Sequence, residues 1–77
     1  SNVVQERVDA IGQFYLTEDR NFIEKFLEQY NVSYIIMGQL ERVFFPGAGL
    51  DKFEALDGIL WSEVYRSGST VIYEVKR

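Results

Sequence analysis

Of the side chains most often used for catalysis and metal binding, this chain offers carboxylates but neither histidine nor cysteine. It therefore lacks the commonest general base, the commonest zinc ligand and any thiolate nucleophile. Glu18 and Asp19 are adjacent, and Glu24 and Glu28 lie four residues apart. These spacings are typical of a helix N-terminus and of a solvated helix face. We therefore expect no catalytic residue, no cofactor and no activity as an autonomous enzyme.

Two patterns after residue 46 also have simple structural interpretations. Asp51, Glu54 and Asp57 lack the alternating oxygen-ligand spacing of a calcium-binding loop. Gly47 and Gly49 lack the third glycine and the strand–helix context of a dinucleotide-binding loop. We interpret the acids as the solvated side of a short helix and the glycines as a flexible turn, and we expect no metal site.

The charge distribution argues against nucleic acid as a partner. The eight basic residues are scattered along the chain, and the net charge is −4. A surface that follows a phosphate backbone, or one that adsorbs to anionic lipid, needs clustered lysine and arginine. We therefore expect no nucleic-acid binding.

The segment after residue 37 contains the first candidate binding group. Glu41 and Arg42 place opposite charges next to Phe44 and Phe45, directly after a predicted buried strand, where functional loops are common. One interpretation is a local ion pair beside two core rings, with little effect on stability if it is exposed. The other is a docking or ligand-contact loop, in which Arg42 is the donor to an anionic group.

A second candidate group is aromatic. If Leu60 and Val64 face the core, then Trp61 and Tyr65 lie on the opposite side of the same strand. An exposed Trp and Tyr pair is typical of contacts with a sugar, a partner protein or a lipid interface. The alternative is that helices cover this face, because a chain this short needs most of its large rings for its core.

Hydrophobic spacing predicts the elements that position these groups. Residues 3–14 have the period of a helix, and a second helix follows, with Thr17 as its N-cap and its end at Asn31. Residues 32–37 (VSYIIM) are short, β-branched and apolar, which predicts a strand buried on both faces. Residues 39–45 are ambiguous, and the spacing of later apolar residues predicts a short helix over residues 50–56.

The last third of the chain predicts a β-hairpin. Residues 59–66 and 70–76 are strand-like and are joined by a glycine-containing loop. In the second run Val71, Tyr73 and Val75 alternate with polar residues and should face the core, whereas Ile72 points the other way. The order is therefore α-α-β-α-β-β. We expect a small two-layer α+β domain with a three-stranded, mostly antiparallel sheet and helices on one face.

The start of the sequence suggests a fragment. Ser1 and Asn2 resemble the remnant of a cleaved expression tag. The chain then enters a helical pattern without an initiator methionine. We therefore expect residues 3–77 to be a single domain taken from a larger protein.

Three segments resemble a known family. Residues 30–42 (YNVSYIIMGQLER) are similar to a KYxVxYIxVGxLER stretch of the YYY family of highly hydrophobic membrane proteins. Residues 50–53 (LDKF) and 71–75 (VIYEV) are similar to the GLxKF and VxIYxV segments of the same C-terminal tail. Gly38, Leu40, Glu41 and Arg42 match the motif, whereas Gln39 stands where the family has proline.

The resemblance implies a location and a partner. Members of that family resemble GT-C-type glycosyltransferases, with many transmembrane helices and a soluble tail outside the cytoplasm. It implies that this domain is an extracytoplasmic accessory domain, anchored in the membrane through its parent and packed on the parent's transmembrane part. It transfers no catalytic residue to this chain.

A different class of function also fits the residues. The domain can be a small ligand-binding or regulatory module that acts as a homodimer. A three-stranded sheet has two open edges, and pairing of such edges is a simple route to dimers.

Overall fold

The chain opens with two helices joined by a short capped turn. The computed structural model describes the backbone of residues 2–77 and the side chains of residues 8–77. Helix α1 spans Asn2–Leu16 and α2 spans Arg20–Gln29, which confirms both predicted helices. The prediction of Thr17 as the second N-cap is wrong, because Asp19 takes that position and its carboxylate accepts from the Asn21 amide at 2.9 Å. The Thr17 hydroxyl instead accepts from the Asp19 amide at 3.0 Å, within the preceding turn.

The asparagine expected from the sequence turns the chain just after the end of α2. Asn31 has a φ of 50°, the left-handed conformation that asparagine tolerates well. The Val32 amide donates to the Leu27 carbonyl at 3.0 Å, and the Asn31 amide donates to the Glu28 carbonyl at 3.2 Å. These two bonds form a Schellman motif, which satisfies the last carbonyls of the helix and turns the chain toward the sheet.

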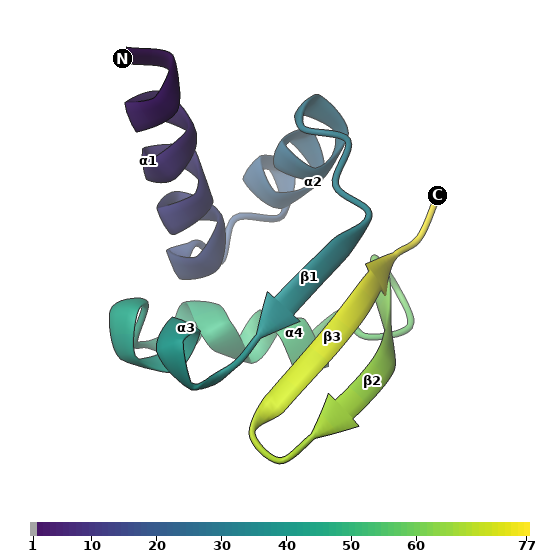
Figure 1. Cartoon of the computed structure of the whole chain (residues 1–77). Coiled ribbons are helices and arrows are strands. Elements are labelled where there is room, and N and C mark those ends of the chain that lie inside the picture. The colour runs from purple at the N-terminus through teal and green to yellow at the C-terminus, as the bar shows by residue number, and fades with distance from the viewer. Residues whose placement is uncertain (1) are drawn as a thin grey trace.

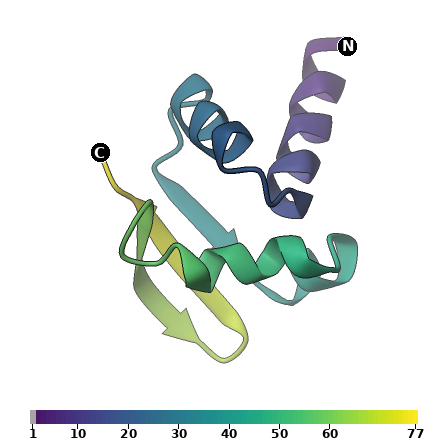
Figure 2. The ribbon, with the colours of Figure 1, turned by 180° about the vertical axis from the view of Figure 1, so that it is seen from behind.

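The sheet has three antiparallel strands, as predicted. Strand β1 spans Tyr34–Met37, β2 spans Trp61–Ser67 and β3 spans Thr70–Val75, in the spatial order β1-β3-β2. Views from the front and from behind show that the helices lie on one side of the sheet and leave its other face open (Figures 1 and 2). The α+β class, the order of the elements and the one-sided helix layer are therefore confirmed.

Three short helices connect β1 to β2. Helix α3 spans Gln39–Phe44, where the sequence was ambiguous, and it is followed by a 3-10 turn, η1, over Ala48–Asp51. Helix α4 spans Lys52–Ala55 and crosses behind the sheet (Figure 1). Together, η1 and α4 form the short helical segment that was predicted there.

The core is largely aromatic and lies between the sheet and the helices. Its central rings are in mutual contact: Phe14 stacks on Phe26 with centroids 4.6 Å apart, and Phe53 lies 5.3 Å from Trp61. Such ring pairs add stability beyond the area they bury. Within residues 8–77, the buried apolar residues are Phe14, Ile23, Phe26, Leu27, Ile35, Met37, Phe53, Trp61, Val71 and Tyr73.

The prediction that β1 is buried on both faces is wrong. Ile35 and Met37 are buried, but Tyr34 and Ile36 are 59% and 54% exposed. Helices cover one face of this sheet only, so alternate residues of an apolar strand remain on the surface. Strand β1 is also an edge strand, because only β3 pairs with it.

A β-bulge changes which side chains of β2 point toward the core, so the prediction for this strand is wrong in part. Glu63 pairs with Tyr73 and Tyr65 pairs with Ile72, so Val64 is an extra residue in the strand. The bulge separates Trp61 from Tyr65: Trp61 is fully buried on the helix side, whereas Tyr65 is 53% exposed on the open face. Of the two alternatives for Trp61, burial under the helices is therefore correct and the exposed position is wrong, and Val64, expected in the core, is on the surface.

Candidate functional site

Helix α3 carries its apolar side chains on the outside. Leu40, Val43 and Phe44 have the i, i+3, i+4 spacing of one helix face, and they are 65%, 65% and 68% exposed. A helix in a small domain normally turns such a face toward the core, yet no residue of α3 is buried. We call these three residues the α3 face, and it is the candidate docking surface.

The charged residues of α3 bond to the domain itself. The Glu41 carboxylate accepts from the Gly38 amide at 2.7 Å, and the Arg42 guanidinium donates to the Ser69 carbonyl at 2.6 Å. Glu41 and Arg42 thus bind backbone groups rather than each other. The first bond caps the start of α3, and the second ties α3 to the turn of the β2–β3 hairpin. Helix α3 is therefore held in place through its polar side.

The two phenylalanines that the sequence groups together have different positions. Phe44 belongs to the exposed α3 face, whereas Phe45 is partly buried and stacks on Tyr15. The centroids of the Phe45 and Tyr15 rings are 5.0 Å apart and their planes are nearly parallel, at 3°. Of the predicted docking residues, Leu40 and Phe44 therefore form the surface, and Gly38, Glu41, Arg42 and Phe45 position it.

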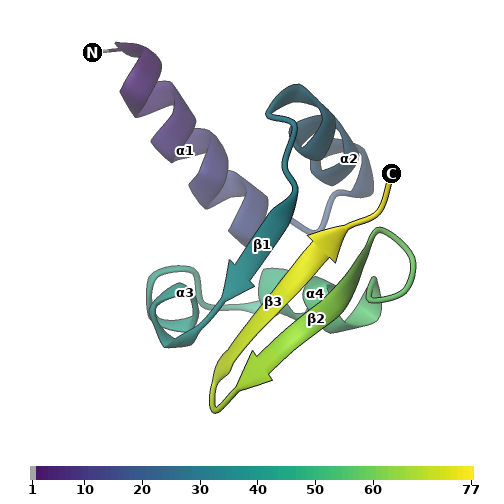
Figure 3. The same ribbon diagram turned by 45° about the vertical axis from the view of Figure 1, so that its right-hand side comes forward.

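The open face of the sheet is a second apolar surface. Ile36 pairs with Ile72, and Ile72 pairs with Tyr65, so these three residues form a row across the strands. Beside that row, the Tyr34 hydroxyl donates to the Glu74 carboxylate at 3.3 Å. Figure 3 shows the three strands with no helix in front of them. We call Tyr34, Ile36, Tyr65 and Ile72 the open-face cluster. Tyr65 is thus in the outward position that the sequence predicted.

The edges of the sheet are less open than its face. The Tyr15 hydroxyl donates to the Ile36 carbonyl at 2.8 Å, which occupies one acceptor on the outer edge of β1. Burial raises the pKa of Tyr15 to about 12, so this hydroxyl stays a donor up to high pH. The opposite edge belongs to β2, whose regular pairing is interrupted by the bulge at Val64. A bulged edge strand is a poor template for an added strand.

A buried lysine joins α1 to the segment before β2, and no pattern of neighbouring residues predicted it. Lys52 is only 7% exposed, and its Nζ donates to the carbonyls of Tyr15 at 2.7 Å and Gly49 at 2.9 Å. Burial lowers the pKa of Lys52 to about 8. A lysine with a lowered pKa is the type used as a nucleophile, but this amine is enclosed and bonded to two backbone groups. The arrangement fits a structural clamp.

A polar hollow lies beneath α3, on the side of α4. Its volume is about 460 Å³, and Arg42, Asp51 and Glu54 contribute charges to its lining. Tyr73 lines it from the core side, and its pKa is raised by burial and by the nearby carboxylate of Glu54. Within residues 8–77, no group of three acidic side chains is arranged to hold a metal ion.

No helix within residues 2–77 is both long enough and apolar enough to cross a bilayer. Comparison of the chain with protein-family models, with curated proteins and with solved structures finds no match in any of the three.

Proposed function

We propose that this chain is a non-catalytic docking domain of a larger membrane protein, and that it packs through the α3 face against the membrane-embedded part of that protein. The observation that carries the proposal is the orientation of α3. Leu40, Val43 and Phe44 point to solvent, while Glu41 and Arg42 are bonded to the domain. The helix therefore offers a surface suited to an apolar partner.

Covering the α3 face is energetically favourable. Burial of a large apolar side chain contributes about 1.5–3 kcal/mol, and three such side chains lie together here. Glu41 and Arg42 already have backbone partners, so a partner that covers the α3 face leaves those bonds in place. Docking would remove apolar surface from water at little electrostatic cost.

The nature of the partner comes from the sequence resemblance. The run from Tyr30 to Arg42, which ends inside α3, is the part that resembles the tail of the YYY family. That resemblance supports a parent with many transmembrane helices and a GT-C-type, glycosyltransferase-like architecture. It also supports a position for this domain on the extracytoplasmic side, where α3 would shape access to the membrane part.

Photo-cross-linking in the complete protein tests this proposal. A benzophenone amino acid is placed at Val43 in the α3 face and, as a control, at Lys25, which is exposed on α2. In native membranes, position 43 should cross-link to a transmembrane segment of the same polypeptide, and position 25 should not. A coding sequence without apolar runs of about 20 residues beyond this chain, or equal cross-linking from both positions, would contradict the proposal.

The open-face cluster supports a second candidate function, a homodimeric module. Tyr34, Ile36 and Tyr65 are each more than half exposed on the open face of the sheet, which is unusual for a domain that works alone. Pairing through this face is better supported than pairing through the edges, which are bonded by Tyr15 on one side and bulged at Val64 on the other. Sedimentation equilibrium of the wild-type chain and of Ile36→Lys distinguishes pairing through the open face from pairing through an edge, because only a face-to-face dimer dissociates in the variant.

A further inference from the structure

A cleft separate from the α3 face lies where α1, the end of α2 and the start of β1 meet. Its volume is about 260 Å³. This exceeds the roughly 150 Å³ of an engineered apolar cavity that takes up benzene. The lining residues are Ile11, Phe14, Tyr15, Phe26, Tyr30, Val32, Tyr34 and Ile35.

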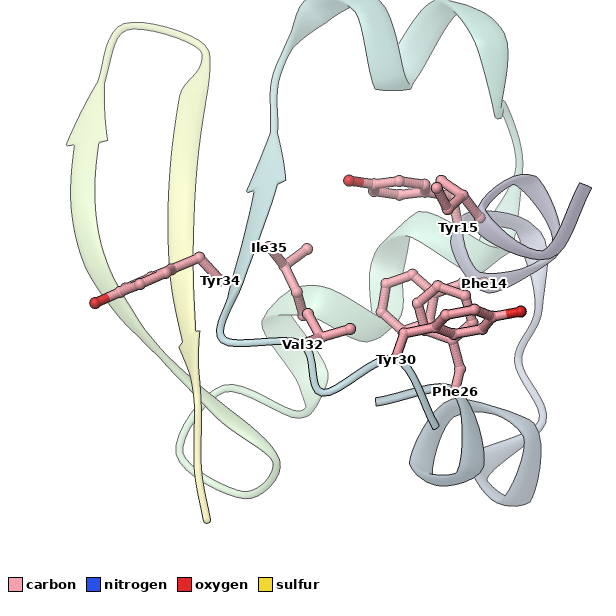
Figure 4. Close-up of a pocket in the computed structure, with 8 residues that line it drawn as sticks. Phe14, Tyr15, Phe26, Tyr30, Val32, Tyr34 and Ile35 are labelled. Carbon is pink, nitrogen blue, oxygen red and sulfur yellow. The ribbon is translucent and has the colours of Figure 1, made fainter. Parts of the chain in front are cut away.

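One wall of the cleft is a continuous set of rings. Phe14 and Phe26 stack with centroids 4.6 Å apart, Tyr30 lies 4.8 Å from Phe26, and Tyr15 lies 5.6 Å from Phe14. Figure 4 shows Val32 and Ile35 opposite, with their side chains directed toward these rings. The walls therefore offer dispersion contacts from two sides to any group that enters.

Of the three tyrosines in the lining, two have hydroxyls that already donate hydrogen bonds. The Tyr15 hydroxyl donates to the Ile36 carbonyl, and the Tyr34 hydroxyl donates to the Glu74 carboxylate. Figure 4 shows the Tyr34 ring directed away from the other labelled side chains. Among residues 8–77, no lysine, arginine, aspartate or glutamate lines the cleft. An occupant would thus be held by its hydrocarbon part and not by a charge.

The mouth of the cleft extends along α1. Ile11 lines the cleft and is 45% exposed, and Val8, one turn earlier, is 56% exposed. Residues at i and i+3 share a helix face, so the apolar surface continues outward from the cleft as a narrow track. A track suits an extended chain better than a compact ring.

We propose that this cleft binds the alkyl chain of a small amphiphile. The chain lies along Val8 and Ile11, enters between Ile11 and Ile35, and ends against the rings of Phe14 and Phe26. The polar head of the amphiphile stays in solvent at the outer end of the track. The inference does not depend on the α3 face or on the function proposed for it.

Titration of the 77-residue chain with straight-chain alcohols tests the proposal. The probes are 1-butanol, 1-hexanol and 1-octanol, followed through the methyl NMR signals of Ile11, Val32 and Ile35. Burial of each methylene should tighten binding about fourfold. Cyclohexanol has the same number of carbons as 1-hexanol and should bind at least tenfold more weakly. Equal binding of the linear and cyclic alcohols would overturn the assignment to an extended chain.

Substitutions at the mouth locate the site. Ile11→Trp fills the entrance and Ile11→Asp places a charge there, and each should weaken 1-octanol binding at least tenfold. Leu16→Trp, at a 49% exposed position of the same helix that is not in the lining, should bind as the wild type does. Methyl shifts confined to residues outside the cleft, or unchanged affinity in both Ile11 variants, overturn the proposal. A variant that alters the α3 face, Leu40→Ser, should bind the alcohols normally, so failure here and failure of the docking function are distinguishable.

Discussion

The Lys52 ammonium lies 2.7 Å from the carbonyl oxygen of Tyr15, at the C-terminal end of α1. The last carbonyls of a helix have no partner within it, and they carry partial negative charge. Lys52 supplies both a donor and a positive charge at that point, and it also bonds to the Gly49 carbonyl. Its Nζ lies 4.5 Å from the centre of the Phe53 ring, a cation–π distance. One side chain thus fastens the first helix to the segment that leads into the hairpin.

Replacing Lys52 by methionine should destabilise the fold by about 1–3 kcal/mol. Methionine fills similar space, but the carbonyls of Tyr15 and Gly49 lose their donor while they remain enclosed. Urea unfolding followed by circular dichroism measures the change. Lys25→Met is the matched control, because Lys25 is exposed on α2 and surface substitutions stay within about 0.5 kcal/mol. Equal stabilities of the two variants would show that the clamp contributes nothing.

Stability should rise with pH between about 8 and 10. Burial lowers the pKa of Lys52 to about 8 from an ordinary 10.5, so in this window the unfolded chain binds more protons than the folded one. The free energy of unfolding then increases with pH. Above pH 10 the trend should reverse. Burial raises the pKa of Tyr15 to about 12 from an ordinary 10.0, so the unfolded state loses its phenolic proton first.

Lys52→Met separates the two parts of this pH profile. The variant lacks the amine, so its stability should not rise between pH 8 and 10, but it should still fall above pH 10 because Tyr15 is retained. Urea midpoints at half-unit pH steps give both curves. If the wild type and the variant have parallel curves between pH 8 and 10, Lys52 is not the group that titrates there.

Gly49→Ala should destabilise the fold by more than about 2 kcal/mol. A Cβ built at Gly49 would come within 2.1 Å of the Leu16 carbonyl oxygen, and backbone atoms cannot move aside as a flexible side chain can. Gly12→Ala is the control, and it should raise the free energy of unfolding instead of lowering it. A Cβ there meets only the Phe45 ring at 3.5 Å, an ordinary contact, and alanine in a helix is favoured over glycine by about 1 kcal/mol. Thermal unfolding of the two variants should show a lower midpoint for Gly49→Ala and a higher midpoint for Gly12→Ala than for the wild type.

Local signals predicted much of this fold. The apolar period of α2, the left-handed asparagine at its end, and the alternation of Val71 and Tyr73 in β3 each depend on near neighbours, and the structure confirms all three. The apolar run of β1 predicted a strand but not how many of its faces are covered. It has the composition of a strand covered on both faces, but only the helix layer on one side covers it, and no local pattern shows whether a second layer exists.

The candidate site depended on features that are not local. The bulge at Val64 reverses the facing of β2 between Trp61 and Tyr65, and an alternating pattern carries no mark of an extra residue. The sequence predicted a docking segment around Glu41, Arg42 and Phe44, but it did not predict a helix with its apolar side outward. One bond that holds the helix in this orientation joins Arg42 to Ser69, which are 27 positions apart. The burial of Lys52 is not predictable from the sequence, because nothing in its neighbours indicates it.

Trp61 should behave as a fully buried indole. Its exposure is 0%, and its Nε1 donates to the Phe53 carbonyl at 2.9 Å. It is the only tryptophan in the chain, so its fluorescence reports this position alone. We expect a blue-shifted emission maximum and little quenching by iodide in the folded state. Emission typical of indole in water, quenched by iodide, would contradict the position of Trp61 under the helices.

Trp61→Phe tests the same position by stability. The variant loses the donor to the Phe53 carbonyl and leaves space in the core, so it should cost about 2–4 kcal/mol in urea unfolding. Tyr65→Phe, on the exposed side of the bulge, should change stability by less than about 0.5 kcal/mol. Comparable losses at the two positions would mean that the bulge does not separate them.

The double variant Leu40→Ser/Phe44→Ser should separate docking from folding. Both side chains are about two thirds exposed, so their loss should change the unfolding free energy of the isolated chain by no more than about 1 kcal/mol. In the complete protein the same change should abolish the cross-link from position 43, because the apolar contact is gone. Lys25→Ser/Glu28→Ser, on the exposed side of α2, is the control and should leave the cross-link unchanged. An isolated domain that unfolds on the double substitution would instead assign Leu40 and Phe44 to the stability of the domain, and the docking role of α3 would fail.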